Sequence, residues 1–450
     1  MKDFTLAEIA KACNGEYVGD ESLKNTKITS VERDSRQVKN GSLFLAIKGE
    51  RVDGHDFIEK CFAQGAVCAL CEKAPENATK PCIVVPSTLD AVKKIGRAYR
   101  EKFDIPVIGI SGSVGKTSTK EMLYAVLSQK FKTHKTQGNL NNELGVPLTL
   151  LSMPEDTEAA VIEMGISDFG EMTRLSEMVQ PTICVLTIIG ECHLENLGDR
   201  DGVLKAKTEM FKNARENADF ILNGDDDKLS TVKTVNGKKP VFFGLDAKND
   251  FYAKNIKNSG DGKVLAILCF DNNNIDVEIP AIGTYMVTNA LAAAAAGKLL
   301  GLTDEEIANG VASYKTVGSR ANVINTGKIK IIDDCYNANP TSVRASLDTL
   351  SNLDGRKVAI LGDMKELGSE ELKLHFDTGV YAKSKGIGTV ITVGELAKEL
   401  AKGADGKAFD TIEDAKPEIL KTIKSGDVVL VKASHSMQFE NIVEFLKQNF

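Results

Sequence analysis

A glycine-rich loop between a predicted strand and a predicted helix is the feature that most constrains the fold of this chain. Residues 106–110 (PVIGI) are apolar and mostly β-branched, as in a buried strand. From Met122 to Leu127 the apolar side chains recur at helical spacing. The residues between these two segments include GSVGKT at 112–117. A strand, a glycine-rich turn and a helix in this order predict a βα unit of an α/β fold.

The loop has the composition of a phosphate-binding turn. Its glycines let backbone N–H groups approach a polyphosphate, and the helix N-terminus adds partial positive charge. Lys116 can reach the β- and γ-phosphates of a nucleotide, and the Thr117 hydroxyl can ligate magnesium. Ile110 stands where the common pattern has its first glycine, so this is the shorter G-x-x-G-K-T form. The alternative is an ordinary strand-to-helix turn. The residues predicted to bind nucleotide are Gly112, Ser113, Val114, Gly115, Lys116, Thr117 and Ser118.

Length and charge limit the class of protein. A chain of 450 residues predicts about two to four domains, each able to bury its own core. The formal net charge is −7, and no run of basic residues is longer than a pair. We therefore expect neither nucleic acid nor an anionic membrane surface as a partner.

The first residues predict a helix rather than a signal peptide. They contain the acidic residues Asp3 and Glu8 and lack a long apolar stretch. Thr5 and Glu8 form a predicted capping box, and Gly15 is the predicted stop. The most apolar tract, 290–302, is short and contains a lysine, which favours a buried helix over a membrane span. We expect a soluble, cytoplasmic protein.

The nine cysteines are an odd number, and most lie in apolar segments, which indicates reduced thiols. One alternative is a zinc site formed by Cys61, Cys68, Cys71 and Cys82. Cys68 and Cys71 lie in AVCALCE, which has the pattern of a strand, so we favour a structural role over zinc.

Three segments follow one another along the chain. Residues 1–104 mix short strands with helices, and ITSVERDSR and SLFLAI around a KNG turn predict a hairpin. Residues 105–326 alternate strand and helix after the glycine-rich loop, which predicts a mostly parallel sheet. Residues 327–450 repeat that alternation, as in a second doubly wound α/β unit. The predicted class is α/β with three domains.

Polar residues follow several of the predicted strands, where ligands bind in parallel sheets. Glu163 ends the strand AAVIE and is suited to hold the magnesium of a nucleotide, although a helix cap or ion pair is the alternative. His193 alone would more often be structural. Lys207 lies in a helical run, where a solvated lysine is the usual interpretation. Asn139 is either a turn residue or a group facing phosphate or substrate.

The motifs together resemble the Mur ligases, ATP-dependent ligases of peptidoglycan precursor synthesis. The family resemblance rests on GSVGKTS, EMG, HLENLGDRDGVLKAKTEMF and TNALAAAAA. TQGNLNNELGVPLTLL, DDCYNANPTSVRASL and LGDMKELG are similar to the member that joins D-alanyl-D-alanine to UDP-N-acetylmuramoyl-tripeptide. The resemblance implies an N-terminal domain for the UDP end of the substrate, a central ATPase domain and a C-terminal Rossmann-like domain. It also implies a reaction through an acyl phosphate and a tetrahedral intermediate.

The resemblance also implies roles for individual residues. Lys116 and Thr117 would contact the γ-phosphate and magnesium, while Glu163 and His193 would hold metal ions. Lys207 matches a lysine that relatives carry as a carbamate, which reverses its reading as a solvated side chain. Further implied contacts are Asn289 with adenine, Arg320 and Asp334 with the nucleotide, Asp34, Ser35, Arg36, Lys48 and Gly49 with the UDP-sugar, Asn139 with substrate, and Asn337 and Asn339 with the dipeptide.

One motif departs from the family pattern. Relatives often read V-K-G-S-R-x-M near the end, whereas this chain has Ala433 and His435 in place of the glycine and arginine. The departure concerns that one contact and not the class. Two alternatives to the dipeptide-adding ligase stay open: a sibling ligase that adds a single amino acid or glutamate, and a nucleotide-binding scaffold without ligase chemistry. We expect a monomer with ATP and Mg2+ as cofactors.

Overall fold

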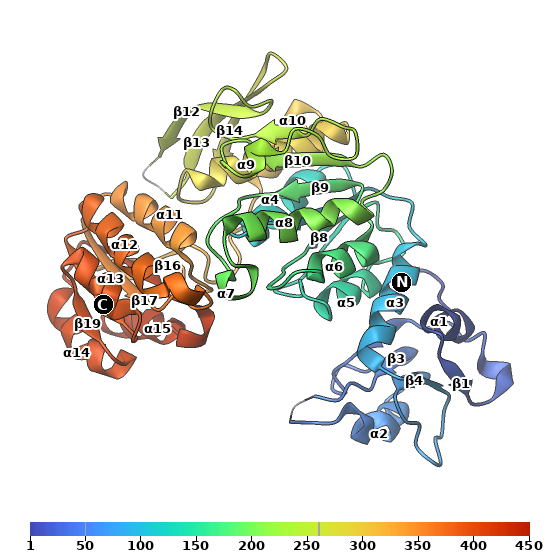
Figure 1. The fold of residues 1–450 in the computed structure, drawn as a ribbon. Helices are drawn as coiled ribbons and strands as arrows, with labels where there is room; N and C mark the ends of the chain where they lie inside the picture. Colours follow the sequence, from blue (N-terminus) through green and yellow to red (C-terminus); the bar gives the residue numbers. More distant parts are fainter. Residues whose placement is uncertain (50, 260–261) are drawn as a thin grey trace.

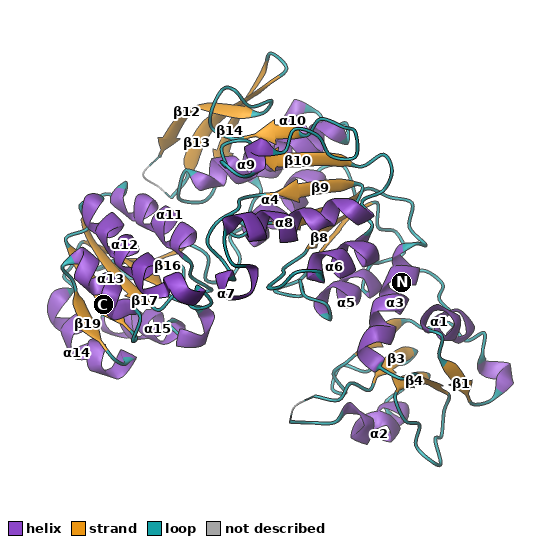
Figure 2. Cartoon of the chain, viewed as in Figure 1, coloured by secondary structure: helices purple, strands orange, loops and turns teal. Residues whose placement is uncertain are grey.

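The computed structural model describes residues 1–49, 51–259 and 262–450. The chain forms three successive parts, and the central part lies between the N-terminal and C-terminal parts (Figure 1). Each part contains helices packed on a sheet (Figure 2). This architecture confirms the predicted α/β class.

The N-terminal part contains a five-stranded sheet in the order β1-β5-β4-β3-β2. Only β1 is antiparallel to its neighbour. Its elements are α1 (Leu6–Cys13), β1 (Glu16–Val18), η1 (Glu21–Leu23), β2 (Ser30–Glu32), β3 (Ser42–Leu45), η2 (Gly54–Phe57), α2 (Ile58–Ala63), β4 (Cys68–Cys71), β5 (Cys82–Val84) and α3 (Thr88–Arg100).

Two local predictions in this part were wrong. β2 and β3 pair in parallel, with Ser30 opposite Ser42, so they are not a hairpin. The long connection 33–41 carries the chain back along the sheet, which a tight turn would not do. The predicted capping box of α1 is confirmed, but Asn14, not Gly15, is the left-handed residue at its end, with φ 55°. Asparagine tolerates that conformation, so glycine was not needed there.

The central part contains a parallel six-stranded sheet in the order β11-β10-β9-β6-β8-β7. Its strands are β6 (Val107–Ser111), β7 (Thr133–Lys135), β8 (Ala159–Glu163), β9 (Ile183–Leu186), β10 (Asp219–Asn223) and β11 (Val241–Phe243). Its helices are α4 (Lys116–Leu127), α5 (Gly145–Leu151), α6 (Glu171–Val179), α7 (Leu194–Leu197), α8 (Arg200–Thr208), η3 (Glu209–Asn213), η4 (Leu229–Thr231), α9 (Tyr285–Leu299) and α10 (Asp304–Ala312).

An antiparallel three-stranded sheet, which the sequence analysis did not foresee, is added to the central part. It consists of β12 (Tyr252–Asn258), β13 (Val264–Phe270) and β14 (Asn273–Ile279). Its apolar side chains join those of α4, α9 and one face of the parallel sheet in a single hydrophobic cluster. The other face packs on α5 and α6 in a second cluster, which α3 of the N-terminal part also enters. The N-terminal part therefore shares one core with the central part and buries a smaller core of its own on the other face of its sheet.

The C-terminal part is a second doubly wound unit, with strand order β15-β16-β20-β17-β18-β19. Only β15 is antiparallel to its neighbour, and it begins before residue 327. The elements are β15 (Asn322–Asn325), β16 (Lys330–Asp333), α11 (Pro340–Ser351), β17 (Arg356–Gly362), η5 (Gly368–Glu370), α12 (Glu371–Ser384), β18 (Thr389–Val393), α13 (Ala397–Ala404), β19 (Lys407–Phe409), α14 (Ile412–Thr422), β20 (Asp427–Lys432), η6 (His435–Met437) and α15 (Glu440–Asn449).

The apolar tract expected to be a buried helix is α9. Its alanines from Ala290 to Ala296 are fully buried, which confirms the interpretation. Among the residues that the structure describes, no helix combines the length and apolarity needed to cross a membrane.

Candidate active site

The glycine-rich loop joins β6 to α4, as predicted. Gly115 precedes the helix in a left-handed conformation, with φ 84°, which a side chain would oppose. A Cβ on Gly112 would overlap the Thr187 hydroxyl of the neighbouring strand end. Lys116 Nζ donates to Gly112 O at 2.8 Å, so the lysine curls over its own loop. Burial lowers the pKa of Lys116, while the charge of Glu163 opposes this shift.

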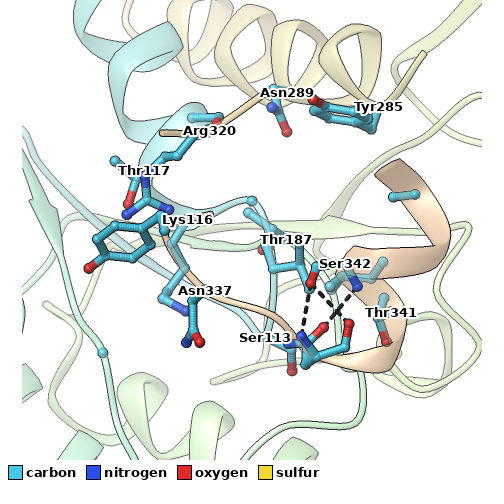
Figure 3. Close-up of a pocket in the computed structure, with 18 of the residues that line it drawn as sticks. Ser113, Lys116, Thr117, Thr187, Tyr285, Asn289, Arg320, Asn337, Thr341 and Ser342 are labelled. Carbon is cyan, nitrogen blue, oxygen red and sulfur yellow. Dashed lines mark hydrogen bonds between the residues drawn. The ribbon is translucent and has the colours of Figure 1, made fainter. Parts of the chain in front are cut away.

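A cavity of about 450 Å³ lies in front of this loop, between the central and C-terminal parts. Figure 3 shows Lys116 and Thr117 from α4 facing Arg320 and Asn337, with Asn289 and Tyr285 on α9 beyond them. The sequence-predicted residues that line the cavity are Ser113, Val114, Gly115, Lys116, Thr117, Ser118, Glu163, His193, Asn289, Arg320, Asp334, Asn337 and Asn339.

The other candidates do not line this cavity. Asn139 lies in the loop before α5, and Lys207 is buried in α8. The UDP-sugar candidates lie in the N-terminal part, in the loops that follow β2 and β3 at the same end of the sheet. Their charges are partly paired: Arg36 donates to Asp34 and holds the pKa of that carboxyl down, to about 2. The candidates in these loops are Asp34, Ser35, Arg36, Lys48 and Gly49.

Glu163 ends β8 beneath the loop and is only 1% exposed. Thr117 Oγ1 donates to its Oε2 at 2.9 Å, and Asn141 Nδ2 donates to its Oε1 at 2.8 Å. The loop threonine and the strand-end carboxylate therefore meet, as the magnesium prediction requires. Oxygen groups of this kind suit Mg2+.

His193 stands in the loop between β9 and α7, with a left-handed backbone, φ 52°. Such a conformation is uncommon for a residue other than glycine and is often found at functional sites. Its Nδ1 is buried and makes no hydrogen bond of good geometry with the described residues, although Glu366 Oε2 lies 2.6 Å away. Burial and the nearby charge of Lys207 lower the pKa of His193, while Glu366 opposes this shift. A neutral imidazole fits a metal ligand.

Lys207 is 1% exposed in α8. Burial lowers its pKa to about 8, and the nearby positive charge of Lys116 adds to the shift, whereas Cys192 opposes it. A larger share of this amine is therefore neutral near pH 8 than in an exposed lysine. The interpretation of Lys207 as a solvated lysine, which its position in a helical run favoured, is therefore wrong.

Within the described ranges, no three His, Cys, Asp or Glu side chains gather as a ready-made metal site. The nine cysteines are free and buried.

The C-terminal loop after β16 forms the opposite wall. The Arg320 guanidinium lies 3.7 Å from the centre of the Tyr336 ring. Asp334 Oδ2 accepts hydrogen bonds from Ser346 Oγ and Lys432 Nζ, both at 2.6 Å, so its carboxylate already has partners. These contacts hold the loop against the sheet.

The two asparagines expected to meet the dipeptide also have structural partners. Asn339 caps α11, with its Oδ1 accepting from Ser342 N at 2.8 Å. Asn337 Oδ1 accepts from Ala338 N at 2.9 Å. Asn289 accepts from Thr119 Oγ1 at 3.0 Å. In each case the amide has a remaining donor or acceptor for a ligand.

Several groups at the site were not singled out from the sequence. Tyr336 supports Arg320, Glu366 contacts His193, and Lys120 lies 3.8 Å from Glu163. Lys120 had a usable signal, since it follows Lys116 by about one turn of the predicted helix. Glu366 had none, because its contact joins two separate parts of the chain.

Comparisons with known proteins agree with this architecture. Three family models match: the Mur ligase family catalytic domain at 27–101, the Mur ligase middle domain at 110–297, and the Mur ligase glutamate ligase domain at 319–435. Among curated relatives, the UDP-N-acetylmuramoyl-tripeptide–D-alanyl-D-alanine ligase of Bacillus subtilis is 37% identical, with 98% of each chain covered. The enzyme of that name from Escherichia coli is 34% identical, covering 100% of this chain and 99% of the relative.

Solved structures give the same answer. A crystal structure of MurF from Acinetobacter baumannii matches with a TM-score of 0.92 at 32% identity, covering 100% of this chain and 99% of that one. The MurF ligase from Thermotoga maritima, solved in complex with ADP, matches with a TM-score of 0.84 at 30% identity, covering 93% and 97%. On fold, on full-length identity and on all three family models, this chain belongs to the Mur ligase family.

Proposed function

We propose that this chain is an ATP-dependent ligase that joins D-alanyl-D-alanine to UDP-N-acetylmuramoyl-tripeptide. The products are UDP-N-acetylmuramoyl-pentapeptide, ADP and phosphate. The observation that carries the proposal is that Lys116, Glu163 and His193 line the same cavity as the loop around Asn337. Relatives named for this reaction support it over their full length.

The chemistry explains why a nucleotide is needed. A carboxylate does not condense with an amine in water, because its oxygen is a poor leaving group. Transfer of the γ-phosphoryl group of ATP turns the tripeptide carboxylate into an acyl phosphate. The free amine of the dipeptide then attacks the acyl carbon and forms the C–N bond. The tetrahedral intermediate loses a proton from nitrogen and expels phosphate as the carbonyl re-forms.

The glycine-rich loop supports the first step. Its backbone N–H groups and the N-terminus of α4 face the cavity and suit the phosphates. Lys116 lies at the same place and would neutralise charge on the transferring group, with Arg320 opposite. Asn289 and Asp334 would contact the rest of the nucleotide.

Thr117, Glu163 and His193 would hold Mg2+, whose bound form neutralises phosphate charge. The lowered pKa of the His193 imidazole and the buried carboxylate of Glu163 support this assignment. Lys207 would act as a carbamate: its neutral amine adds CO2, forms an N–C bond and releases a proton. The lowered pKa of Lys207 favours that addition.

The remaining contacts concern the other substrates. Asn337 and Asn339 would face the dipeptide, and Asn139 the growing peptide. The loops that carry Asp34 and Lys48 would meet the UDP-sugar. Closure of the C-terminal part over the central part would keep the acyl phosphate dry. We also propose a cytoplasmic monomer, since one chain supplies both walls of the cavity.

The decisive experiment measures phosphate release from ATP and Mg2+ with UDP-N-acetylmuramoyl-tripeptide as acceptor. We expect release that depends on D-alanyl-D-alanine, with a product heavier by that dipeptide. Release switched on by a single amino acid instead would identify a sibling ligase. ATP binding without any amine-dependent release would identify a scaffold. Running diaminopimelate- and lysine-containing tripeptides in parallel would also show the acceptor preference.

A further inference from the structure

A row of buried charges lies behind Glu163. We call Glu163, Lys120, Glu121 and Lys135 the charge row. Lys120 is 1% exposed, and its Nζ lies 3.8 Å from Glu163 Oε2 and 3.0 Å from Glu121 Oε1. Its third contact is a hydrogen bond to Thr136 O at 2.9 Å. Glu121 pairs in turn with Lys135 on β7. The charge row therefore contains two carboxylates and two ammonium groups.

Helical spacing places the row on one side of α4. Lys120 and Glu121 follow Thr117 by three and four positions, so all three face β7 and β8, where Glu163 ends. Lys120, Glu121 and Lys135 do not line the cavity. Burial of an ammonium group is costly unless it is paired. Lys120 has paired with the carboxylate that a metal ion would need.

The front of Glu163 is also rich in positive charge. Lys116 and Arg320 both line the cavity in front of this carboxylate. A divalent cation arriving alone would meet a carboxylate that is already compensated from behind and cationic groups in front. A cation bound to a polyphosphate would bring its own negative charge.

We propose that Lys120 is a positioning residue whose ammonium compensates Glu163 from behind, so that a divalent cation binds strongly only together with the nucleotide phosphates. The inference rests on the proposed function, because it takes Glu163 as a metal ligand. It adds a role for a side chain that touches neither substrate nor cavity.

The test measures Mn2+ binding to the full chain by electron paramagnetic resonance, with and without ADP. Without ADP, we expect weak binding to the wild type and binding about tenfold tighter or more in K120M, which removes the ammonium at similar length. K120R keeps the charge and should behave like the wild type. K120M/E121Q restores a neutral charge row and should return towards wild-type affinity. K120M/E163Q should lose the gain, which places it at Glu163.

Equal nucleotide-free affinities of wild type and K120M would overturn the inference, as would a K120M/E121Q variant that binds as tightly as K120M. If K120M fails to fold, E121Q is the second test. It makes the charge row net positive and should weaken Mn2+ binding in the presence of ADP; unchanged affinity would overturn the inference. The proposed metal role fails separately: E163Q would then leave Mn2+ binding with ADP unchanged.

Discussion

At the scale of single residues, burial decides which side chains carry unusual chemistry. Removal of water penalises the charged form of a lysine or histidine, so the pKa of Lys207 and that of His193 both fall. The buried Glu163 instead collects donors from Thr117 and Asn141. The same physical effect thus shifts Lys207 and His193 towards their neutral forms and leaves Glu163 as an oriented carboxylate.

Lys207 should form a carbamate. At fixed dissolved CO2, we expect a carbon-13 carbamate signal that grows from about pH 7 to about pH 9, because the pKa of Lys207 is about 8 and deprotonation exposes the amine lone pair. NMR with labelled bicarbonate measures it. K207R should lack the signal and lower kcat by about 10²-fold or more. An identical spectrum for wild type and K207R would contradict the assignment.

His375 should make stability depend on pH. It is fully buried; its Nε2 accepts from Met364 N at 2.8 Å and its Nδ1 donates to Glu371 O at 2.7 Å, so the neutral ring is satisfied. Burial lowers the pKa of His375. Below about pH 6.5 the unfolded chain therefore binds a proton that the native ring refuses, and the free energy of unfolding falls as pH falls.

The matched variant for this test is H375Q, which keeps a hydrogen-bonding side chain but does not titrate. Denaturant unfolding at several pH values should show the stability advantage of wild type over H375Q shrinking below about pH 6.5, by at most about 1.4 kcal/mol per pH unit. A constant difference across that range would refute the idea. Taking the difference removes the contributions of the other histidines.

At the scale of elements, the features that could be predicted from the sequence are those set by residues a few positions apart in the chain. The capping box at Thr5, the strand ending at Glu163 and the glycine-rich turn all follow from spacing over a few residues. Pairing of strands is different, because it is decided by packing across the sheet. The β2–β3 pair was predicted wrongly for that reason, and the added sheet β12–β14 was not predicted at all.

Asn339 has two proposed roles, as the N-cap of α11 and as a contact of the dipeptide. Its side chain caps α11 at the edge of the cavity. N339A should lower the free energy of unfolding by about 1 kcal/mol, while N339S keeps an N-cap oxygen and should recover most of it. If Asn339 also meets the dipeptide, both variants should raise the KM for D-alanyl-D-alanine. Thermal unfolding and steady-state kinetics separate the two roles; a KM that follows stability alone would leave only the cap.

At the scale of the whole molecule, the site exists only where two parts of the chain meet. Thr341 Oγ1 on α11 donates to Glu191 Oε2 at 2.6 Å, and Glu366 reaches His193. No local pattern indicates such contacts, because the residues lie far apart in the sequence. The resemblance to relatives supplied Arg320, which spacing alone would not have singled out.

Gly190 allows the two parts to approach. It lies in the loop before His193, and a Cβ there would overlap the Thr341 hydroxyl and come within 3.0 Å of Thr341 Cβ. G190A should therefore hold the C-terminal part away from the central part and lower kcat for ligation. ADP binding should change less, because the glycine-rich loop belongs entirely to the central part. Phosphate release and calorimetric ADP titration measure the two effects.

A substitution of Thr341, the other residue of this contact, should compensate for G190A. T341A removes the hydroxyl that the new methyl group would meet, so G190A/T341A should recover part of the kcat lost in G190A, even though T341A alone forfeits the hydrogen bond to Glu191. Small-angle scattering with nucleotide and both substrates should show a larger radius of gyration for G190A than for the double variant. If the two substitutions instead lower kcat independently, the approach of Gly190 to Thr341 plays no part in closing the site.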